Sequence, residues 1–158
     1  MNTFFISDTH FGHANIMKYE PKHRPFASVE EHDEELVRRW NSVVRPKDTV
    51  WHLGDVLFGV EAFDTLERLN GTKNLILGNH DKYPITKYLN SFKKIRGTTT
   101  FAGYWLSHQP LAVSSIERFN GNIHGHMHSK CIDDDRYINV SVERINLTPI
   151  AFEELKEC

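Results

Sequence analysis

Histidine occupies every second position at the end of the segment GNIHGHMH, residues 121–128. Side chains of an extended chain alternate between its two faces, so His124, His126 and His128 would lie along one side. Imidazole is a common metal ligand, and it also occurs in protein interiors as a satisfied hydrogen-bonding group. The segment alone leaves metal binding and a structural role equally open.

Other potential ligands follow four further apolar runs of the sequence. They are Asp8 and His10 after FFIS, Asp55 after VWHLG, Asn79 with His80 and Asp81 after LILG, and His108 after YWLS. In α/β sheets the loops beyond the carboxyl ends of the strands converge on one crevice, where ligands bind. An unpaired buried polar group costs about 2–7 kcal/mol in apolar surroundings, so a structural reading needs a separate reason for each run. A single metal site explains all of them.

The chemistry of these side chains indicates which ions they suit. The candidate ligands are Asp8, His10, Asp55, Asn79, His108, His126 and His128. Carboxylate, imidazole and amide groups without thiolate favour manganese, iron, zinc or nickel over a structural cysteine-rich zinc, and manganese is expected first. Seven ligands are too many for one tetrahedral ion. The number indicates two metal ions with Asp55 between them, which leaves open positions for water and substrate.

The elements that must position these residues are strands alternating with helices, which predicts an α/β fold. Strands are expected at residues 3–7, 50–54, 74–78 and 136–145, and extended hairpin structure at residues 94–107. Residues 28–31, SVEE, have the form of a capping box that opens a helix. Leu36, Val37, Trp40, Val43 and Val44 follow at the spacing of one helix face.

A second helix face is expected from Phe63, Leu66 and Leu69, with Asn70-Gly71 as its C-terminal stop. The final residues, FEELKEC, predict a short helix. No repeat, low-complexity tract or linker divides the sequence, so one domain over residues 1–158 is expected.

Composition and charge limit the class of protein. The chain has 158 residues, of which 39% are hydrophobic and 25% charged, as in an ordinary soluble domain. It contains no apolar run near the ~20 residues of a membrane span and does not start like a signal peptide, so a cytoplasmic location is expected. A net charge of −2 argues against an extended nucleic-acid surface. Cys131 and Cys158 lie outside every motif and are expected to be reduced bystanders.

The ordered motifs carry a family resemblance. They are Asp8-x-His10, Gly54-Asp55, Gly78-Asn79-His80-Asp81, His108 in SHQP, and Gly125-His126-x-His128. Together they resemble the complete motif set of the calcineurin-like metallophosphoesterases. The segment ISDTHFGHANI, followed by RPF, is similar to the small stand-alone phosphoesterases of bacteria and phages. The resemblance implies a four-layer α-β-β-α sandwich of two central mixed sheets flanked by helices.

The resemblance also implies roles for the motif residues. It assigns Asp8, His10 and His128 to one metal ion, and Asn79, His108 and His126 to the other, with Asp55 as the bridge. It implies a hydrolase in which a hydroxide held by the metals attacks a phosphate ester in line. His80 would steady the phosphate or protonate the leaving oxygen, and Asp81 would orient His80. His124 would support the ligands from behind.

The expected substrate is a small phosphate ester such as a nucleotide, and analogy with small family members favours a phosphodiester. A phosphomonoesterase, either nucleotidase or protein phosphatase, is the alternative. A non-catalytic scaffold on the same fold would be expected to lack ligands, and none is missing. His13, Arg24 and Arg118 lie in loops beside motifs and are candidate substrate contacts, although each position also suits an exposed side chain without a role.

Overall fold

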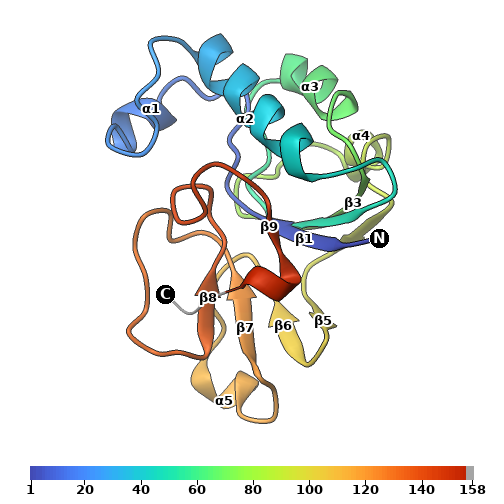
Figure 1. Cartoon of the computed structure of the whole chain (residues 1–158), viewed down its shortest axis with the longest axis vertical. Coiled ribbons are helices and arrows are strands. Elements are labelled where there is room, and N and C mark those ends of the chain that lie inside the picture. Colours follow the sequence, from blue (N-terminus) through green and yellow to red (C-terminus); the bar gives the residue numbers. More distant parts are fainter. Residues whose placement is uncertain (156–158) are drawn as a thin grey trace.

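A computed structural model describes residues 1–155, in which two β-sheets stack face to face with helices outside them (Figure 1). The first sheet contains, in spatial order, β4 (Lys94–Arg96), β3 (Thr72–Ile76), β2 (Thr49–His52), β1 (Thr3–Ile6) and β9 (Ile150–Ala151). Its strands β1 to β4 run parallel to their neighbours, and β9 runs antiparallel to β1. The carboxyl ends of β1, β2 and β3 therefore lie at one edge.

The second sheet contains, in spatial order, β5 (Thr99–Phe101), β6 (Tyr104–Leu106), β7 (Gly121–His124) and β8 (Tyr137–Asn139). Strands β6, β7 and β8 are parallel, whereas β5 is antiparallel to β6. An isolated parallel bridge between Ser7 and Ser141 joins the loops that follow β1 and β8. This bridge brings the carboxyl edges of the two sheets together.

Alternate residues of β1 face different layers, which explains its continuous apolar sequence. Phe4 and Ile6 belong to the core between the first sheet and the helices, where Trp40 is almost fully buried. Phe5 points the other way and packs with Ile123 in the core between the sheets. Each fully buried side chain of this size contributes about 1.5–3 kcal/mol. The two cores hold both sheets in fixed positions at the shared edge.

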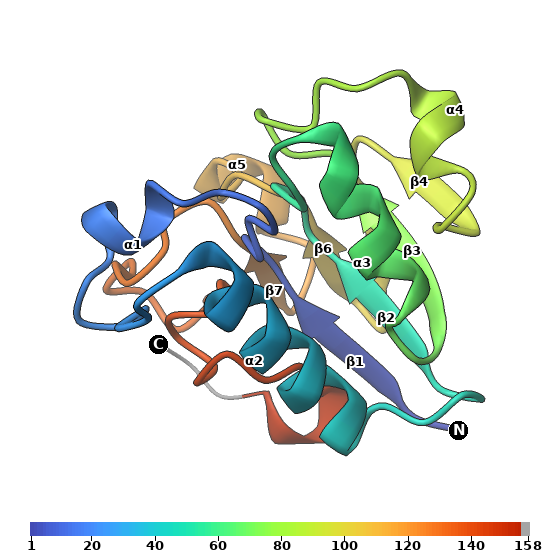
Figure 2. The same ribbon diagram turned by 90° about the horizontal axis from the view of Figure 1, so that it is seen from above.

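Helices α2 (Val29–Val43) and α3 (Phe63–Glu67) lie over the outer face of the first sheet (Figure 2). The expected capping box is present, since Ser28 Oγ accepts a hydrogen bond from the Glu31 N–H at 3.1 Å. The Glu31 carboxylate reaches the Ala27 N–H instead of that of Ser28. Val43, expected on the buried helix face, is 36% exposed.

The layer outside the second sheet is thin. Helix α5 (Val113–Ile116) covers β6, because Trp105 Nε1 donates to the Ser115 carbonyl at 3.1 Å and packs on the Phe119 ring. The four-layer α-β-β-α arrangement expected from the resemblance is thus confirmed, with one short helix as its last layer. The remaining short elements are α1 (Ile16–Tyr19), α4 (Ile85–Tyr88), η1 (Val60–Ala62) and η2 (Phe152–Glu154).

Three expectations about secondary structure need correction. The expected hairpin at residues 94–107 is divided between the sheets, with β4 paired to β3 and only β5 and β6 forming a hairpin. The expected strand at residues 136–145 ends at Asn139, and a turn follows in which Asn146 and Leu147 have positive φ. The histidine segment is extended only to His124, where β7 ends.

The C-terminal segment was expected to be a short helix, and the structure shows a single 3-10 turn, η2. Residues 156–158, including Cys158, lie outside the described part of the chain. Cys131 is an exposed free cysteine. Among residues 1–155, no helix combines the length and the apolar character that crossing a membrane requires.

Candidate metal centre

The seven candidate ligands meet at the shared carboxyl edge of the two sheets. Asp8, His10 and His128 place one ligand atom each within 4.8 Å of one another, and we call them the first ligand group. Asp55, His108 and His126 form a second such set. Asn79 joins it, because its Oδ1 lies 2.9 Å from His108 Nε2 and 3.0 Å from His126 Nδ1. These four residues are the second ligand group.

The first ligand group contains polar atoms without a partner, and its members Asp8 and His10 are buried while His128 is partly exposed. Asp8 Oδ2 accepts hydrogen bonds from the His126 N–H and the Ser141 hydroxyl, both at 2.9 Å. Its other oxygen, Oδ1, has no partner among residues 1–155, and neither has His10 Nε2. Asp8 Oδ1 lies 3.9 Å from His10 Nε2 and 3.8 Å from His128 Nε2. Buried polar atoms are rarely left unsatisfied, so these three converging atoms fit a cation between them.

The second ligand group has its ligand atoms already in contact. His108 Nε2 and His126 Nδ1 are 3.2 Å apart, and both approach Asn79 Oδ1. His108 Nδ1 donates to the Leu53 carbonyl at 2.8 Å, which leaves the lone pair of Nε2 directed at the group. Two imidazoles and an amide oxygen at these spacings are a suitable donor set for a divalent transition metal. Asn79 is exposed, so this group is open to solvent.

Asp55 lies between the two groups. Its Oδ2 is 3.7 Å from His10 Nε2 in the first group and 3.4 Å from His108 Nε2 in the second. Its Oδ1 accepts the His80 N–H at 2.9 Å, which holds the carboxylate in this orientation. One carboxylate therefore faces both sets of ligands, as a bridging ligand must.

The backbone at the ligands is strained. Asp8, His10, Asp55, His126 and His128 have φ between 51° and 68°, which makes them five of the eight non-glycine residues with positive φ in the described chain. Asp and His tolerate this region better than most residues, but each such conformation costs about 1–3 kcal/mol. Strain concentrated on candidate ligands favours a functional site over a merely structural cluster.

Two positions at the same edge require glycine, because neighbouring atoms approach the backbone too closely for a side chain. A Cβ on Gly78 would overlap the carboxylate and backbone N–H of Asp55, and one on Gly125 would overlap Ser7 Oγ and Asp8 Oδ2. The glycines that precede Asn79 and His126 therefore allow the loops of the two sheets to pack closely enough to bring their ligands together.

The electrostatics favour metal-binding forms of several ligands. Burial acts to raise the pKa of Asp8, but the neighbouring histidines, His10 first among them, hold that pKa well below its usual range. Burial lowers the pKa of His10, which is therefore neutral at pH 7. Burial also acts to lower the pKa of His108, but Asp55 and Asp8 raise it to about 9. A cation bound to the second ligand group must displace that proton.

Glu143 is a residue of the site that the sequence analysis did not identify. It is buried, and its Oε1 accepts from His128 Nδ1 at 3.0 Å and from Arg24 Nε at 2.8 Å. This hydrogen bond fixes the tautomer of His128 and directs Nε2 toward Asp8. Burial acts to raise the pKa of Glu143, but His128 and Arg24 hold it below its usual value. The charged residue directly after the apolar run INVSV was the available signal.

The two arginines expected to contact substrate lie elsewhere. Arg24 is fully buried, with Nη1 donating to the Thr9 carbonyl at 3.0 Å and Nη2 donating to the Asp8 carbonyl and to Glu143. Its guanidinium thus stabilises the turn that carries Asp8. Arg118 is exposed and precedes the amino end of β7, whereas the ligands follow the carboxyl end. The prediction that Arg24 and Arg118 contact the substrate was therefore wrong.

The structure separates the expected pair His80 and Asp81. His80 is exposed at the edge, with its ring centroid 6.2 Å from that of His10. The Asp81 carboxylate accepts the N–H groups of Gly78 and Asp55, each at 2.8 Å, and that of Val56 at 3.0 Å. Asp81 therefore holds two ligand loops together and does not orient the His80 ring, which corrects the expectation.

The other two histidines lie beside the ligands. His13 is half-buried, stacks on the Phe58 ring at 3.9 Å, and has its Nδ1 3.1 Å from that of His10. Burial lowers the pKa of His13 to about 4. His124 is buried at the end of β7, where Nδ1 donates to the Gly125 carbonyl at 2.8 Å. This bond ties the His124 ring to the residue before His126, in the place where a supporting role was predicted.

Comparisons with known proteins identify relatives of this chain. The Calcineurin-like phosphoesterase superfamily domain matches residues 1–146. An uncharacterised protein of Methanocaldococcus jannaschii is 39% identical over 163 aligned residues, which cover 95% of this chain and 86% of that protein. The gene 66 protein of Mycobacterium phage D29 is 29% identical, with 83% of this chain and 80% of that protein covered.

Among solved structures, the crystal structure of a protein of unknown function from Aquifex aeolicus is similar to this one. The TM-score is 0.79 at 27% sequence identity, and the superposition covers 97% of this chain and 96% of that chain. The family match covers every candidate ligand and all strands of the two sheets except β9. The chain belongs to the calcineurin-like phosphoesterase superfamily, a family of metal-dependent phosphoesterases.

Proposed function

We propose that this protein is a phosphodiesterase that acts with two divalent metal ions. The observation that carries the proposal is the position of Asp55, whose Oδ2 faces His10 of the first ligand group and His108 of the second within 3.7 Å. Apart from Asp55, each group offers three donors of its own, which are Asp8, His10 and His128 in the first group and Asn79, His108 and His126 in the second. Such an arrangement suits two ions better than one.

The donor set determines which residues would hold the ions. Asp8, His10 and His128 would hold the first, Asn79, His108 and His126 the second, and Asp55 both. When bound, such ions lower the pKa of a coordinated water and neutralise charge on the phosphoryl oxygens. Oxygen and nitrogen donors without thiolate suit manganese first, with iron, zinc or nickel as substitutes.

His80 is the residue of this chain best placed to move a proton. Its side chain is exposed beside the ligands, and its backbone N–H donates to Asp55 Oδ1 at 2.9 Å. This bond fixes the backbone of His80 next to the centre, and its imidazole belongs to neither ligand group. We assign it the task of protonating the oxygen that leaves phosphorus, which is the usual work of a general acid.

The charge around the centre supports a diester substrate. Phosphoryl groups of higher charge are commonly held by Arg or Lys in addition to metal ions. Arg24 is buried behind the first ligand group, and Arg118 lies at the other end of β7. Neither arginine adds charge to that of the metal ions at the centre, and a diester, with a single charge, needs none. A small phosphodiester, such as a nucleotide ester, is the substrate class we propose.

The test compares two chromogenic substrates with the manganese-loaded protein. The kcat/KM for bis(p-nitrophenyl) phosphate should exceed that for p-nitrophenyl phosphate by about tenfold or more. This ratio corresponds to the free energy lost when one charge of the monoester has no partner. A preference for the monoester would make the protein a phosphomonoesterase. Full metal loading without hydrolysis of either ester would identify a non-catalytic scaffold on the same fold.

A further inference from the structure

A groove adjoins the second ligand group, and no role has been assigned to it so far. It has a volume of about 340 Å³, at the small end of the range of ligand pockets. Its walls include Asn79, Gly97, Thr98, His108, Gln109 and Leu111, and we call it the side groove. Two of these residues are members of the second ligand group, so a molecule bound over the centre can extend into the groove.

The topology places the side groove at the same edge as the ligands. The chain crosses from the first sheet to the second between β4 and β5, at Gly97 and Thr98. The backbone carbonyl of Arg96, just before the crossing, accepts a hydrogen bond from the Leu77 N–H at 2.9 Å. This bond fixes the crossing beside the carboxyl end of β3. On the other side, β5 starts opposite Leu106, the last residue of β6. The groove is thus framed by the strand ends that carry Asn79 and His108.

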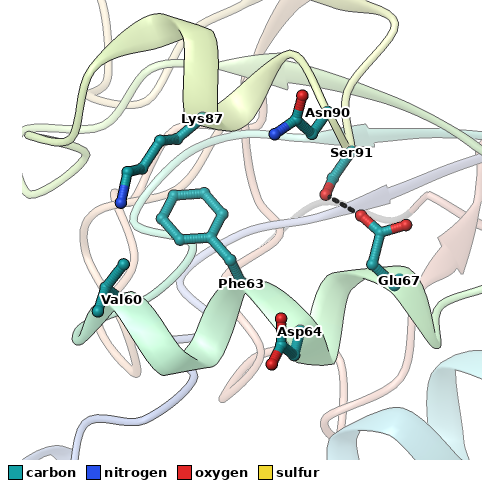
Figure 3. Close-up of a pocket in the computed structure, with 7 residues that line it drawn as sticks. All are labelled: Val60, Phe63, Asp64, Glu67, Lys87, Asn90 and Ser91. Atoms are coloured by element: carbon teal, nitrogen blue, oxygen red, sulfur yellow. Dashed lines mark hydrogen bonds between the residues drawn. The ribbon is translucent and has the colours of Figure 1, made fainter.

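The lining of the side groove has no fixed charge. No Lys, Arg, Asp or Glu is among the described residues that line it. A second hollow of about 300 Å³, between α3 and α4, differs in this respect, because Asp64, Glu67 and Lys87 line it (Figure 3). We call that hollow the α3–α4 pocket, and it shares no residue with either ligand group. The only ionisable side chain among the described lining residues is His108, which belongs to the second ligand group, so a second phosphate or a carboxylate farther along the side groove would meet no Lys or Arg.

The side groove nevertheless offers free hydrogen-bonding groups. The side chains of Thr98 and Gln109 are exposed and make no hydrogen bond to the rest of residues 1–155. The Ser107 hydroxyl is already used, because it donates to the Gln109 carbonyl at 2.6 Å and accepts from Asn122 at 3.0 Å. A ligand in the groove would therefore meet one free hydroxyl and one free amide, which suit hydroxyl groups of an uncharged substituent.

The position of His80 indicates which part of a diester would enter the side groove. The His80 ring lies near those of His10 and Phe58, at centroid distances of 6.2 and 5.3 Å, on the side of the first ligand group. An acid there serves a leaving oxygen on that side. The substituent that stays on phosphorus then points toward Asn79 and His108, which border the groove.

We propose that the side groove binds the retained, uncharged alcohol substituent of a phosphodiester, a group of about nucleoside size. This inference rests on the proposed function, because it places the phosphoryl group over the two ligand groups. The inference adds that the enzyme selects its substrates by the retained substituent, which Thr98 and Gln109 would recognise. The reaction then yields a monoester that still carries the bound substituent and an alcohol that receives the proton.

Two substrates with the same leaving group isolate this contact. The p-nitrophenyl ester of thymidine monophosphate and methyl p-nitrophenyl phosphate both release p-nitrophenol, and they differ only in the retained substituent. The wild-type protein should prefer the thymidine ester by about tenfold or more in kcat/KM, the equivalent of a few buried groups. Equal values for the two substrates would overturn the proposal.

Gly97→Phe adds a large side chain at the wall of the side groove. A Cβ on Gly97 meets no atom within 4 Å, and the backbone there is outside the left-handed region, so the position accepts the larger residue without strain. The preference for the thymidine ester should then fall to near unity. Asn90→Phe, which fills the α3–α4 pocket instead, is the matched control and should keep the wild-type preference. An unchanged preference in Gly97→Phe would contradict the proposal.

Gln109→Ala and Thr98→Ala provide a test that does not depend on the folding of the glycine variant. Each removes one hydrogen-bonding group from an exposed position and should raise KM for the thymidine ester by about two- to twelvefold, as for one hydrogen bond. KM for the methyl ester should change less. Equal effects on both substrates, or no effect, would count against the groove as the binding site.

A binding measurement separates this proposal from the proposed function. Thymidine monophosphate added to zinc-loaded, isotope-labelled protein should shift the amide signals of Gly97, Thr98 and Gln109 in NMR spectra. If these shifts occur while neither ester is hydrolysed, the groove is a binding site and the proposed function fails. If both esters are hydrolysed without these shifts and without preference, the proposed function stands and the groove proposal is wrong.

Discussion

The two ligand groups differ in how the chain prepares them for a cation. In the first, Asp8 and His10 are buried and keep atoms without partners, and His128 is fixed by the buried Glu143. In the second, Asn79 is exposed, and the ligand atoms contact one another. Each group has one buried carboxylate and one buried histidine, so the groups differ in the anionic support of Glu143 behind His128 and in the exposure of Asn79. An anionic partner behind a ligating histidine strengthens metal binding. If the proposed function holds, this difference predicts one tightly held ion and one more weakly held ion beside the substrate.

The largest effect is expected from the residue that the groups share. Asp55→Ala removes a ligand from both sets and should lower kcat by about 10⁴-fold or more, because it removes two strong electrostatic contacts. Asn79→Ala touches only the second group and should lose less, with one equivalent of metal retained on elemental analysis. Equal and mild losses in both variants would show that Asp55 does not link the groups.

A selective loss is expected at His80, which belongs to neither group. His80→Ala should keep its metal and lose about 100- to 10,000-fold in rate for an alkyl leaving group. With p-nitrophenyl esters the loss should be much smaller, since the departing phenolate needs no proton. Metal content and a leaving-group series on both proteins check this. Loss of metal would make His80 a ligand, and a uniform loss across leaving groups would make it a phosphate-holding residue.

An asymmetric change in affinity is expected from Glu143. Glu143→Gln weakens the support of His128 and should lower metal affinity at the first group by about 10- to 100-fold, with the second group little affected. Stepwise metal titration calorimetry measures the two affinities. Asp81→Asn is the matched control at the second ligand group, because it weakens the hydrogen bonds that hold the loops of Gly78 and Asp55. If the affinities of both metal-binding steps fell by the same factor in Glu143→Gln, Glu143 would not support the first ligand group selectively.

The smallest effect concerns pH in the metal-free protein. The folded-state pKa of His108 is raised from 6.5 to about 9, with Asp55 and Asp8 outweighing burial. Its protonation therefore adds stability that is fully present below pH 6.5 and is lost as pH rises through about 9. Thermal melts should show Tm falling by a few degrees across this window in the metal-free protein. With metal bound the trend should reverse, because ligation needs the deprotonated ring. A Tm that rises in the metal-free protein would contradict the pairing.

The ligand types and their strand ends could be predicted because each follows an apolar run in the sequence. Asp55 and His108 are examples, since a strand must end where its apolar alternation ends and the next polar residue lies at the sheet edge. The helix after Ser28 was equally readable, because a capping box and a long amphipathic face are both local signals.

The support behind the first group could not be predicted in this way. Arg24 and Glu143 are 119 residues apart, and their ion pair exists only once both sheets are assembled. A lone arginine in a loop is indistinguishable from a solvated charge until its partner is known. The four-residue helices, such as α4, lack the periodicity that a prediction needs. The left-handed backbone at His126 depends on contacts between loops, as Gly125 demonstrates.

Counting the bound metal tests the central claim most directly. The protein is dialysed against excess manganese, and bound metal is measured by elemental analysis as the difference between protein solution and dialysate, with Asn79→Ala as the matched variant. Two unequal ligand groups predict close to two equivalents in the wild-type protein and one in the variant, with the retained ion held by Asp8, His10 and His128. A reproducible single equivalent in the wild-type protein at saturating manganese would contradict the account.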